Sequence, residues 1–291
     1  MSKLKCWVEA MRLRTLPVSV AGVIGACGYA LCHGRFAWAP AVLCLLFAIL
    51  AQVASNFANE YYDFKGGLDR KGRVGPRRGV TEGDIAPGAM RTAVFVTLAM
   101  ACAVGLSLVY WGGWWLIAVG IIIAAGVLAY STGPFPLSHH GLGEVAVVFF
   151  FGVIPVNFTC YLITGSFGTE TAAGSVAFGL MGANVLIVNN YRDRDDDRDV
   201  GKRTLAVILG RKAVSALYFA NGIAAYALVL PVWMTMPRLA LVAPLIYLGL
   251  HTLLYFNLIK RKGTALNPLL GMTACLMLLY ALMFTAAAAC G

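Results

Sequence analysis

Residues 37–70 read AWAPAVLCLLFAILAQVASNFANEYYDFKGGLDR, an apolar run that passes without a break into a segment rich in Asn and Asp. A helix needs about 20 mainly apolar residues to span a bilayer, and residues 37–58 supply them. The same order returns at residues 172–199, where a second apolar run leads into NNYRDRDDDRD. Together the two stretches predict spanning helices whose ends carry carboxylates at the membrane surface.

The composition of the whole chain is typical of a membrane protein. Of its 291 residues 60% are hydrophobic and 12% are charged, and the mean hydropathy is +0.77. Soluble domains are about 45–50% apolar and about 25% charged, so a water-soluble globular fold is excluded, and so is disorder. We predict an all-α polytopic membrane protein with nine transmembrane helices, at approximately residues 16–32, 37–58, 90–111, 114–130, 145–163, 172–190, 213–234, 239–258 and 267–289.

The distribution of charge predicts the orientation of these helices. The formal net charge is +10, and cytoplasmic loops of membrane proteins are enriched in Lys and Arg, so the charge needs no nucleic-acid partner. With a cytoplasmic N-terminus, only Arg35 and Arg238 of the 23 Lys and Arg residues lie outside, and only Glu170 of the 13 acidic residues does. We expect a multi-pass protein of the cell (cytoplasmic) membrane with its polar clusters on the cytoplasmic face.

The first acidic cluster, NFANEYYDFKGGLD, places polar side chains on one face of a helix. Asn56, Asn59 and Asp63 are spaced i, i+3 and i+7, which aligns them along the helix. The glycine pair that follows lets the chain turn back, so that Asp69 can face the same side. The cluster therefore predicts four oxygen-bearing side chains around one point.

The second acidic cluster repeats this pattern on another helix. Asn189, Asp193 and Asp197 are spaced i, i+4 and i+8 and share a face. The two parent runs are the second and the sixth, so both clusters emerge on the same side of the membrane and can form one site. Four other acidic residues of the same loops are expected to form solvated surface ion pairs instead: Asp195, Asp199, Glu82 and Asp84.

Carboxylates that share a face near the low-dielectric membrane repel each other unless a cation lies among them. Oxygen ligands from Asp and Asn suit Mg²⁺, which usually binds one or two carboxylates together with the phosphate oxygens of a substrate. Basic residues of the same loops suit such a phosphate: Lys65, Arg70, Lys71, Arg77, Arg78, Arg192, Arg198, Lys202 and Arg203. We predict a Mg²⁺–diphosphate site on Asp63, Asp69, Asp193 and Asp197.

Four stretches of the chain resemble the UbiA superfamily of intramembrane aromatic prenyltransferases. They are RLRTLPVSVAGVIG (12–25), NFANEYYDFKGGLDRKGRVGPRRGVTEG (56–83), YSTGPFPLSHHGLGEV (130–145) and NNYRDRDDDRDVGKRTLAVILG (189–210). They most resemble the branch that prenylates 1,4-dihydroxy-2-naphthoate in menaquinone (vitamin K2) biosynthesis. The interval from Asp63 to Asp69 exceeds the three intervening residues of the general superfamily pattern, and the naphthoate branch shares this longer spacing.

The resemblance implies a fold and a reaction. The fold is a single domain over residues 1–291 with motif halves of roughly 1–131 and 132–291. It is a UbiA-type bundle of nine helices around a central cavity open to the cytoplasmic side. The implied reaction is Mg²⁺-dependent: a polyprenyl diphosphate alkylates 1,4-dihydroxy-2-naphthoate, and diphosphate and CO₂ leave, giving demethylmenaquinol. The implied partners are these two substrates and the lipid bilayer.

The resemblance also implies roles for individual residues. The four aspartates would hold the metal, with Asn59 as a neutral ligand. Tyr130 would face the allylic cation, or else it is an interfacial tyrosine. Arg12 and Arg14 would bind the naphthoate carboxylate or the diphosphate, or else they anchor the first helix. The full set of expected substrate-binding residues is Asn56, Asn59, Asn189, Lys65, Arg77, Arg78, Arg192, Lys202, Arg12 and Arg14.

Three other functions compete with this interpretation. A transporter would place its ionisable residues near the bilayer midplane, whereas here they gather at one face. A phosphatidyl-alcohol transferase also uses membrane aspartates and Mg²⁺, but concentrates them in one motif. Within the superfamily, the acceptor could instead be 4-hydroxybenzoate or homogentisate.

Overall fold

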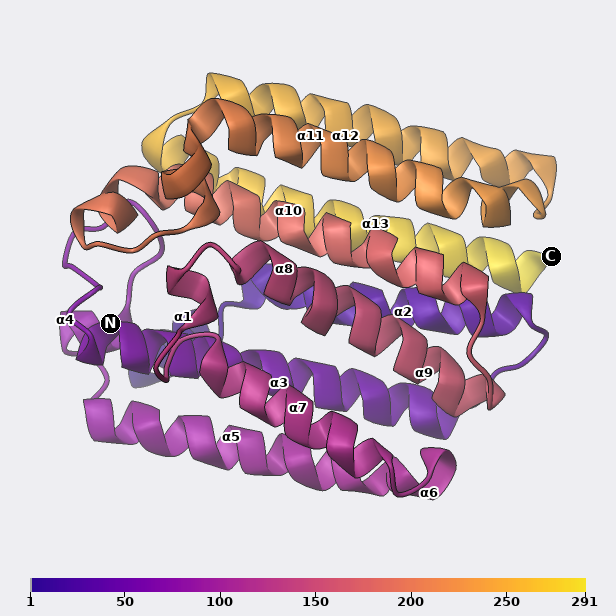
Figure 1. Cartoon of the computed structure of the whole chain (residues 1–291), viewed down its shortest axis with the longest axis horizontal. Helices are drawn as coiled ribbons and strands as arrows, with labels where there is room; N and C mark the ends of the chain where they lie inside the picture. The colour runs from indigo at the N-terminus through magenta and orange to yellow at the C-terminus, as the bar shows by residue number, and fades with distance from the viewer. Residues whose placement is uncertain (1) are drawn as a thin grey trace.

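The computed structural model describes residues 2–291, and every regular element within them is helical (Figure 1). Eight stretches are long and apolar enough to cross a membrane when contiguous helices are counted together, and α7 is apolar but has 14 residues. The all-α membrane class is therefore confirmed, and the count of nine spans stays a prediction. The helices are α1 (Lys3–Ala10), α2 (Leu16–Cys32), α3 (Trp38–Lys65), α4 (Gly79–Glu82), α5 (Pro87–Ser107), α6 (Val109–Gly112), α7 (Leu116–Ala129), α8 (Gly143–Val147), α9 (Ile154–Thr164), α10 (Thr169–Asp199), α11 (Leu205–Met234), α12 (Val242–Lys260) and α13 (Asn267–Cys290).

The long helices lie nearly parallel to one another, and the two termini lie at opposite ends of the bundle (Figure 1). The connections that follow α3, α7, α10 and α12 all lie at the end that holds the N-terminus. Helices α3 and α10 run in the same direction. Both acidic clusters therefore reach the same end of the molecule, as their position after the second and sixth apolar runs predicts.

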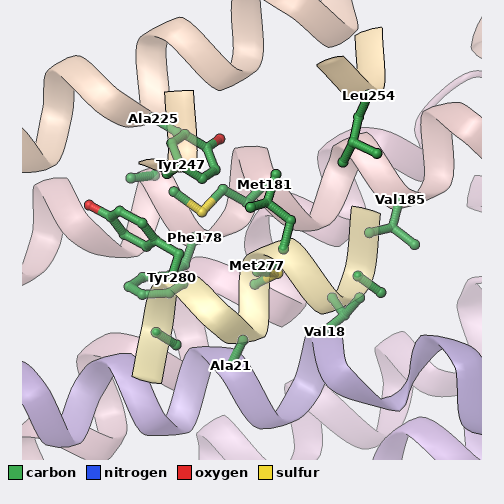
Figure 2. Close-up of a cluster of buried hydrophobic side chains, with 14 of the residues drawn as sticks. Val18, Ala21, Phe178, Met181, Val185, Ala225, Tyr247, Leu254, Met277 and Tyr280 are labelled. Atoms are coloured by element: carbon green, nitrogen blue, oxygen red, sulfur yellow. The ribbon is translucent and has the colours of Figure 1, made fainter. Parts of the chain in front are cut away.

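The core lies where α2, α10, α11, α12 and α13 meet, and it is made of aliphatic and aromatic side chains (Figure 2). Phe178 and Met181 of α10 pack there against Tyr280 and Met277 of α13, and all four are buried. Helix association in lipid depends on close van der Waals packing rather than on exclusion of water. This interlocking core fixes the position of α10, which carries the second acidic cluster.

A close contact between glycines brings the α8–α9 stretch against α10. A Cβ at Gly152 would lie 2.4 Å from the Cα of Gly179, so no side chain fits between the two backbones. The chain is π-helical here, over Val148–Val153, and single turns of this kind occur often at functional sites. The contact places the start of α8 beside the polar end of α10.

Candidate active site

A polar cavity of about 150 Å³ lies at the end of the bundle where both acidic clusters emerge. Asn56 and Asn59 of α3 line one part of it, and Asn189, Asp193 and Asp197 of α10 line another. The helical spacing of each cluster turns these side chains toward the interior, as the sequence predicts. Asn190 of α10 also lines the cavity, and further lining residues come from the connections and from other helices: Arg12, Arg73, Arg78, Tyr130, Glu144, Lys202 and Thr204.

An apolar chamber of about 290 Å³ adjoins the polar cavity, between α3, α5, α7 and the α8–α9 stretch. Its walls are almost entirely aliphatic and aromatic. Five residues line both spaces, and we call them the neck: Gln52, Ser55, Tyr130, Val147 and Phe151. A ligand with a charged head and a hydrocarbon tail fits this pair of spaces.

Asn59 joins several segments at the first cluster. Its Oδ1 accepts hydrogen bonds from Arg12 (2.5 Å) and Arg78 (3.0 Å), and its Nδ2 donates to Asp63 and to Ser131, both at 3.2 Å. Arg12 reaches this position because the chain turns between α1 and α2 with Arg12 at φ 54°, the one left-handed non-glycine residue in the part of the chain that the structure describes. Backbone strain of this kind persists only where surrounding contacts hold it.

Asp63 is fully buried and is contacted from two other loops. Lys202 Nζ donates to its Oδ2 at 2.8 Å, and His139 Nε2 lies 3.2 Å from its Oδ1. Burial lowers the pKa of Lys202, but the charges of Asp63 and Asp197 outweigh burial, so that the pKa lies above its ordinary value. The ammonium group therefore stays charged and neutralises the buried carboxylate.

Arg73 links the two acidic clusters through one guanidinium group. Its Nη1 donates to Asp69 Oδ1 at 2.7 Å, and its Nη2 donates to Asp193 Oδ2 at 2.8 Å. Asp69 can turn back to this point because the chain bends at Gly67, which has φ 67°. Burial raises the pKa of Asp69, and Arg73 opposes that rise. The bridge therefore holds one carboxylate of the loop that follows α3 and one carboxylate of α10 against the same guanidinium group.

The second cluster is held mainly by contacts within α10. Arg192 donates to both oxygens of Asp193, at 2.6 and 2.8 Å, and also to Asn189 Oδ1 at 2.8 Å. Asp195 is paired with Arg194 and Arg211 at 3.0 Å each, in agreement with the expected surface ion pairs. The Asp199 side chain is 57% exposed.

The cavity is not lined by four of the ten expected substrate-binding residues: Lys65, Arg14, Arg77 and Arg192. Lys65 and Arg14 are exposed, and Arg77 is paired with Asp84 at 2.5 Å with 40% of its side chain exposed. Arg192 and the other expected site residues line the cavity or contact a side chain that does: Asp63, Asp69 and Arg192 belong to the second group. Tyr130 lies half-buried in the neck.

Sequence reasoning missed Arg73, Glu144 and Asn190 as residues of the cavity. Arg73 stands among many basic residues of its loop, and no spacing rule separates it from its neighbours. Glu144 did carry a signal, because an acidic residue at the start of an apolar run is costly and usually functional. Asn190 is one of two adjacent asparagines, and only Asn189 has the spacing of the expected face.

A comparison with protein families identifies the fold that carries this site: the model of the UbiA prenyltransferase family matches residues 20–281. The chain belongs to the UbiA family. A 1,4-dihydroxy-2-naphthoate octaprenyltransferase of Escherichia coli strain K12 is 36% identical over 215 residues, which cover 72% of this chain and 70% of that protein. A protein of the same name from Mycobacterium tuberculosis is 38% identical over 212 residues, with 73% and 72% covered.

Solved structures of UbiA homologues share this fold. One from Archaeoglobus fulgidus, bound to DMAPP and Mg²⁺, superimposes with a TM-score of 0.64 at 17% identity and covers 94% of this chain and 98% of that one. At this identity the likeness concerns the fold. The all-helical bundle of the UbiA family is thus confirmed for this chain.

Magnesium is the cofactor that UbiA membership implies, and the oxygen atoms of the cavity suit it. Within residues 2–291 no three His, Cys, Asp or Glu side chains gather as a metal site, and Arg73 and Lys202 are paired with two of the carboxylates. The donors themselves fit, because carboxylates are hard oxygen ligands. Asp69 Oδ2 is buried without a hydrogen bond, although Arg78 Nε lies 3.3 Å away. This carboxylate oxygen is therefore held by charge pairing alone, and it has the chemistry that a magnesium ligand needs.

Proposed function

We propose that this chain transfers a polyprenyl group from a polyprenyl diphosphate to 1,4-dihydroxy-2-naphthoate, with release of diphosphate and CO₂, in menaquinone biosynthesis. The observation that carries the proposal is the Arg73 bridge between Asp69 and Asp193, beside a cavity that adjoins an apolar chamber. An isoprenyl diphosphate has the polyanionic head and the hydrocarbon tail that this arrangement suits. The naphthoate acceptor is supported by the names of relatives at 36% and 38% identity.

The head group would be held by the residues that surround the polar cavity. Mg²⁺ would be held by the four aspartates of the two clusters, with Asn59 beside them, and when bound it neutralises charge on the diphosphate. The chain's own cations act in the same direction, since Arg73, Arg78 and Lys202 all line the cavity. Donors that are already oriented toward developing charge need no rearrangement during the reaction.

The tail and the reacting carbon would lie in the chamber and the neck. The C1–O bond of the donor breaks, the ring carbon attacks C1, and the ring carboxylate leaves as CO₂. The apolar walls exclude water, which would otherwise capture the allylic cation. Tyr130 lies in the neck, where its ring can face that cation. Arg78 Nη1 is buried without a hydrogen-bond partner and suits an anionic group of either substrate, and Arg12 lies beside it, since both donate to Asn59 Oδ1.

The site faces the cytoplasm of a multi-pass protein in the cell membrane, and residues 1–291 form one domain. The distribution of charged residues supports this orientation, since Arg35, Arg238 and Glu170 alone lie at the opposite side. Reporter fusions at Gly75 and Gly201 should therefore read cytoplasmic, and a fusion at Gly168 should read external. A cytoplasmic signal at Gly168 would show that the orientation is wrong.

An acceptor competition in purified protein tests the proposed reaction. Farnesyl or geranylgeranyl diphosphate with Mg²⁺ is offered to 1,4-dihydroxy-2-naphthoate, 4-hydroxybenzoate and homogentisate in parallel, and prenylated product and CO₂ are measured. We expect prenylation of the naphthoate with one CO₂ released per product. Prenylation of 4-hydroxybenzoate with the naphthoate left unchanged would refute the acceptor and leave the family membership intact.

A further inference from the structure

Glu144 is a buried carboxylate that the reaction described above leaves without a task. Glu144 lies at the start of α8, is 6% exposed, and lines the polar cavity. Its Oε1 accepts a hydrogen bond from Asn190 Nδ2 at 2.8 Å, whereas its Oε2 is buried and has no hydrogen-bond partner. A buried carboxylate oxygen without a partner is costly, so this atom points to a ligand that donates a hydrogen bond.

A second buried glutamate, whose oxygens do not reach the cavity, serves as a comparison. Glu60 of α3 is 1% exposed and accepts a hydrogen bond from the backbone N–H of Val80 at 3.0 Å. It thereby fastens α4 to α3, and it does not line the polar cavity. Neither of its oxygens is left buried and unpaired. Glu144, by contrast, lines the polar cavity and has one buried oxygen without a hydrogen-bond partner.

The position of Glu144 matches the place where the acceptor ring must lie. Val147 follows it by one helical turn and belongs to the neck, and a Cβ at its neighbour Gly143 would lie 3.6 Å from Tyr130 Oη. The reacting carbon of the donor lies between its head and its tail, so it must pass through the neck. The ring that attacks this carbon must therefore be in reach of Glu144.

We propose that Glu144 is a catalytic residue that binds a ring hydroxyl of the aromatic acceptor and accepts its proton. This proposal rests on the proposed prenyl transfer. As the new C–C bond forms, the hydroxyl O–H bond breaks, its proton moves to Glu144 Oε2, and the oxygen becomes a carbonyl. When the C–CO₂ bond breaks, its electron pair restores the aromatic ring and the oxygen takes the proton back. Asn190 is a positioning residue that holds the other carboxylate oxygen.

The E144Q variant tests this role, with E60Q as the matched control. General-base catalysis contributes typically about 10²–10⁴ in rate, so we expect acceptor turnover in E144Q to fall at least about 10²-fold. Binding of a non-reactive donor analogue, farnesyl thiodiphosphate with Mg²⁺, should be unchanged in both variants. E60Q should turn over at close to the rate of the unmodified chain, since Gln retains the oxygen that accepts from Val80.

Chemical rescue separates proton transfer from a structural role. The E144A variant leaves space beside Asn190, and added formate should restore part of its turnover while leaving E60Q unaffected. Full activity in E144Q, or a folded E144A that still binds the donor analogue but does not respond to formate, would overturn the proposal. Absence of naphthoate prenylation in the unmodified chain would instead refute the proposed function, before any variant is compared.

Discussion

The two acidic clusters serve one cavity but are built in different ways. In the second cluster, Asp193 and Asp197 stand one helical turn apart on α10, so the helix fixes their spacing. In the first, Asp63 stands on α3 while Asp69 follows the glycine turn and is held by the side chains of Arg73 and Arg78. The second cluster is a rigid half of the site, and the first is a half whose geometry depends on charge pairing between loops.

The largest expected effect on turnover comes from removing one carboxylate from either half of the site. D63N and D193N each remove one negative charge at constant size, so the metal and diphosphate lose a preorganised partner. Such a loss costs typically about 10²–10³ in rate, and we expect turnover to fall at least about 10²-fold in each variant, measured with purified protein at saturating Mg²⁺. Because residues that act as one unit are non-additive, the double variant should be little worse than either single one.

D199N is the control for both variants. Asp199 lies on α10 close to the same cluster, but its side chain is 57% exposed and does not line the cavity. Its turnover should change little. Near-normal turnover in D63N or in D193N would remove that aspartate from the site and, with it, the assembly of one centre from two helices.

An intermediate effect, on stability and proteolysis, tests whether only the first half of the site depends on charge pairing. R73Q removes the guanidinium that contacts Asp69 and Asp193. Breaking a fully buried ion pair lowers the free energy of unfolding by about 3–5 kcal/mol. Because the Arg73 side chain is partly exposed, we expect R73Q to lower the free energy of unfolding by about 2 kcal/mol. Without Mg²⁺, trypsin should cut the loop at residues 70–71 faster in R73Q, while cleavage at residues 202–203 stays unchanged.

R70Q is the matched control for R73Q, since it removes an arginine of the same loop whose contact, with the carbonyl oxygen of Asp199 at 3.3 Å, is at the surface. It should leave the unfolding temperature unchanged. Equal acceleration of cleavage in both loops of R73Q would contradict the view that only the first half depends on charge pairing.

The smallest expected effect concerns pH and the contact between Lys202 and Asp63. The pKa of Lys202 is raised above its ordinary value of 10.5, so the folded chain keeps a proton that the unfolded chain loses. The resulting stabilisation is complete below about pH 10.5 and is lost as pH rises through the higher folded value. K202Q should therefore be less stable at neutral pH, and its unfolding temperature should fall less between pH 9 and pH 11.5 than that of the unmodified chain.

K212Q serves as the control for this measurement, because Lys212 is exposed at the surface of α11. Its unfolding temperature should follow that of the unmodified chain over the whole pH range. Parallel curves for K202Q and the unmodified chain would mean that the contact with Asp63 adds no pH-dependent stability.

The sequence predicts most of what depends on local spacing. Apolar runs locate the long helices, and the i, i+4 spacing of Asn189, Asp193 and Asp197 predicts the side chains that turn toward the cavity. The first apolar run, 16–32, omits α1, because its residues Lys3–Ala10 mix polar and apolar side chains. The π-helical stretch Val148–Val153 lies inside a continuous apolar run and leaves no mark in the hydropathy pattern.

Contacts between distant segments could not be predicted in this way. The Arg73–Asp193 pair spans 120 positions, and the Glu144–Asn190 pair joins two different helices. Which of the many basic residues of a loop reaches inward depends on the path of that loop. Arg73 is turned toward the two carboxylates with 16% of its side chain exposed, whereas Lys65 and Arg77 are left at the surface. Side-chain type and spacing do not encode that path.

The Arg73 bridge has a consequence for the order in which ligands enter. Asp63, Asp69 and Asp193 each already contact an ammonium or guanidinium group, so a lone divalent cation would add unbalanced positive charge to a buried site. A bare diphosphate would meet the carboxylates with unbalanced negative charge. The two ligands together nearly cancel, and charge imbalance is most costly where water is excluded. Metal and donor should therefore bind as a cooperative pair, each tightening the other by the same factor, which calorimetric titration of Mg²⁺ with and without farnesyl thiodiphosphate would measure.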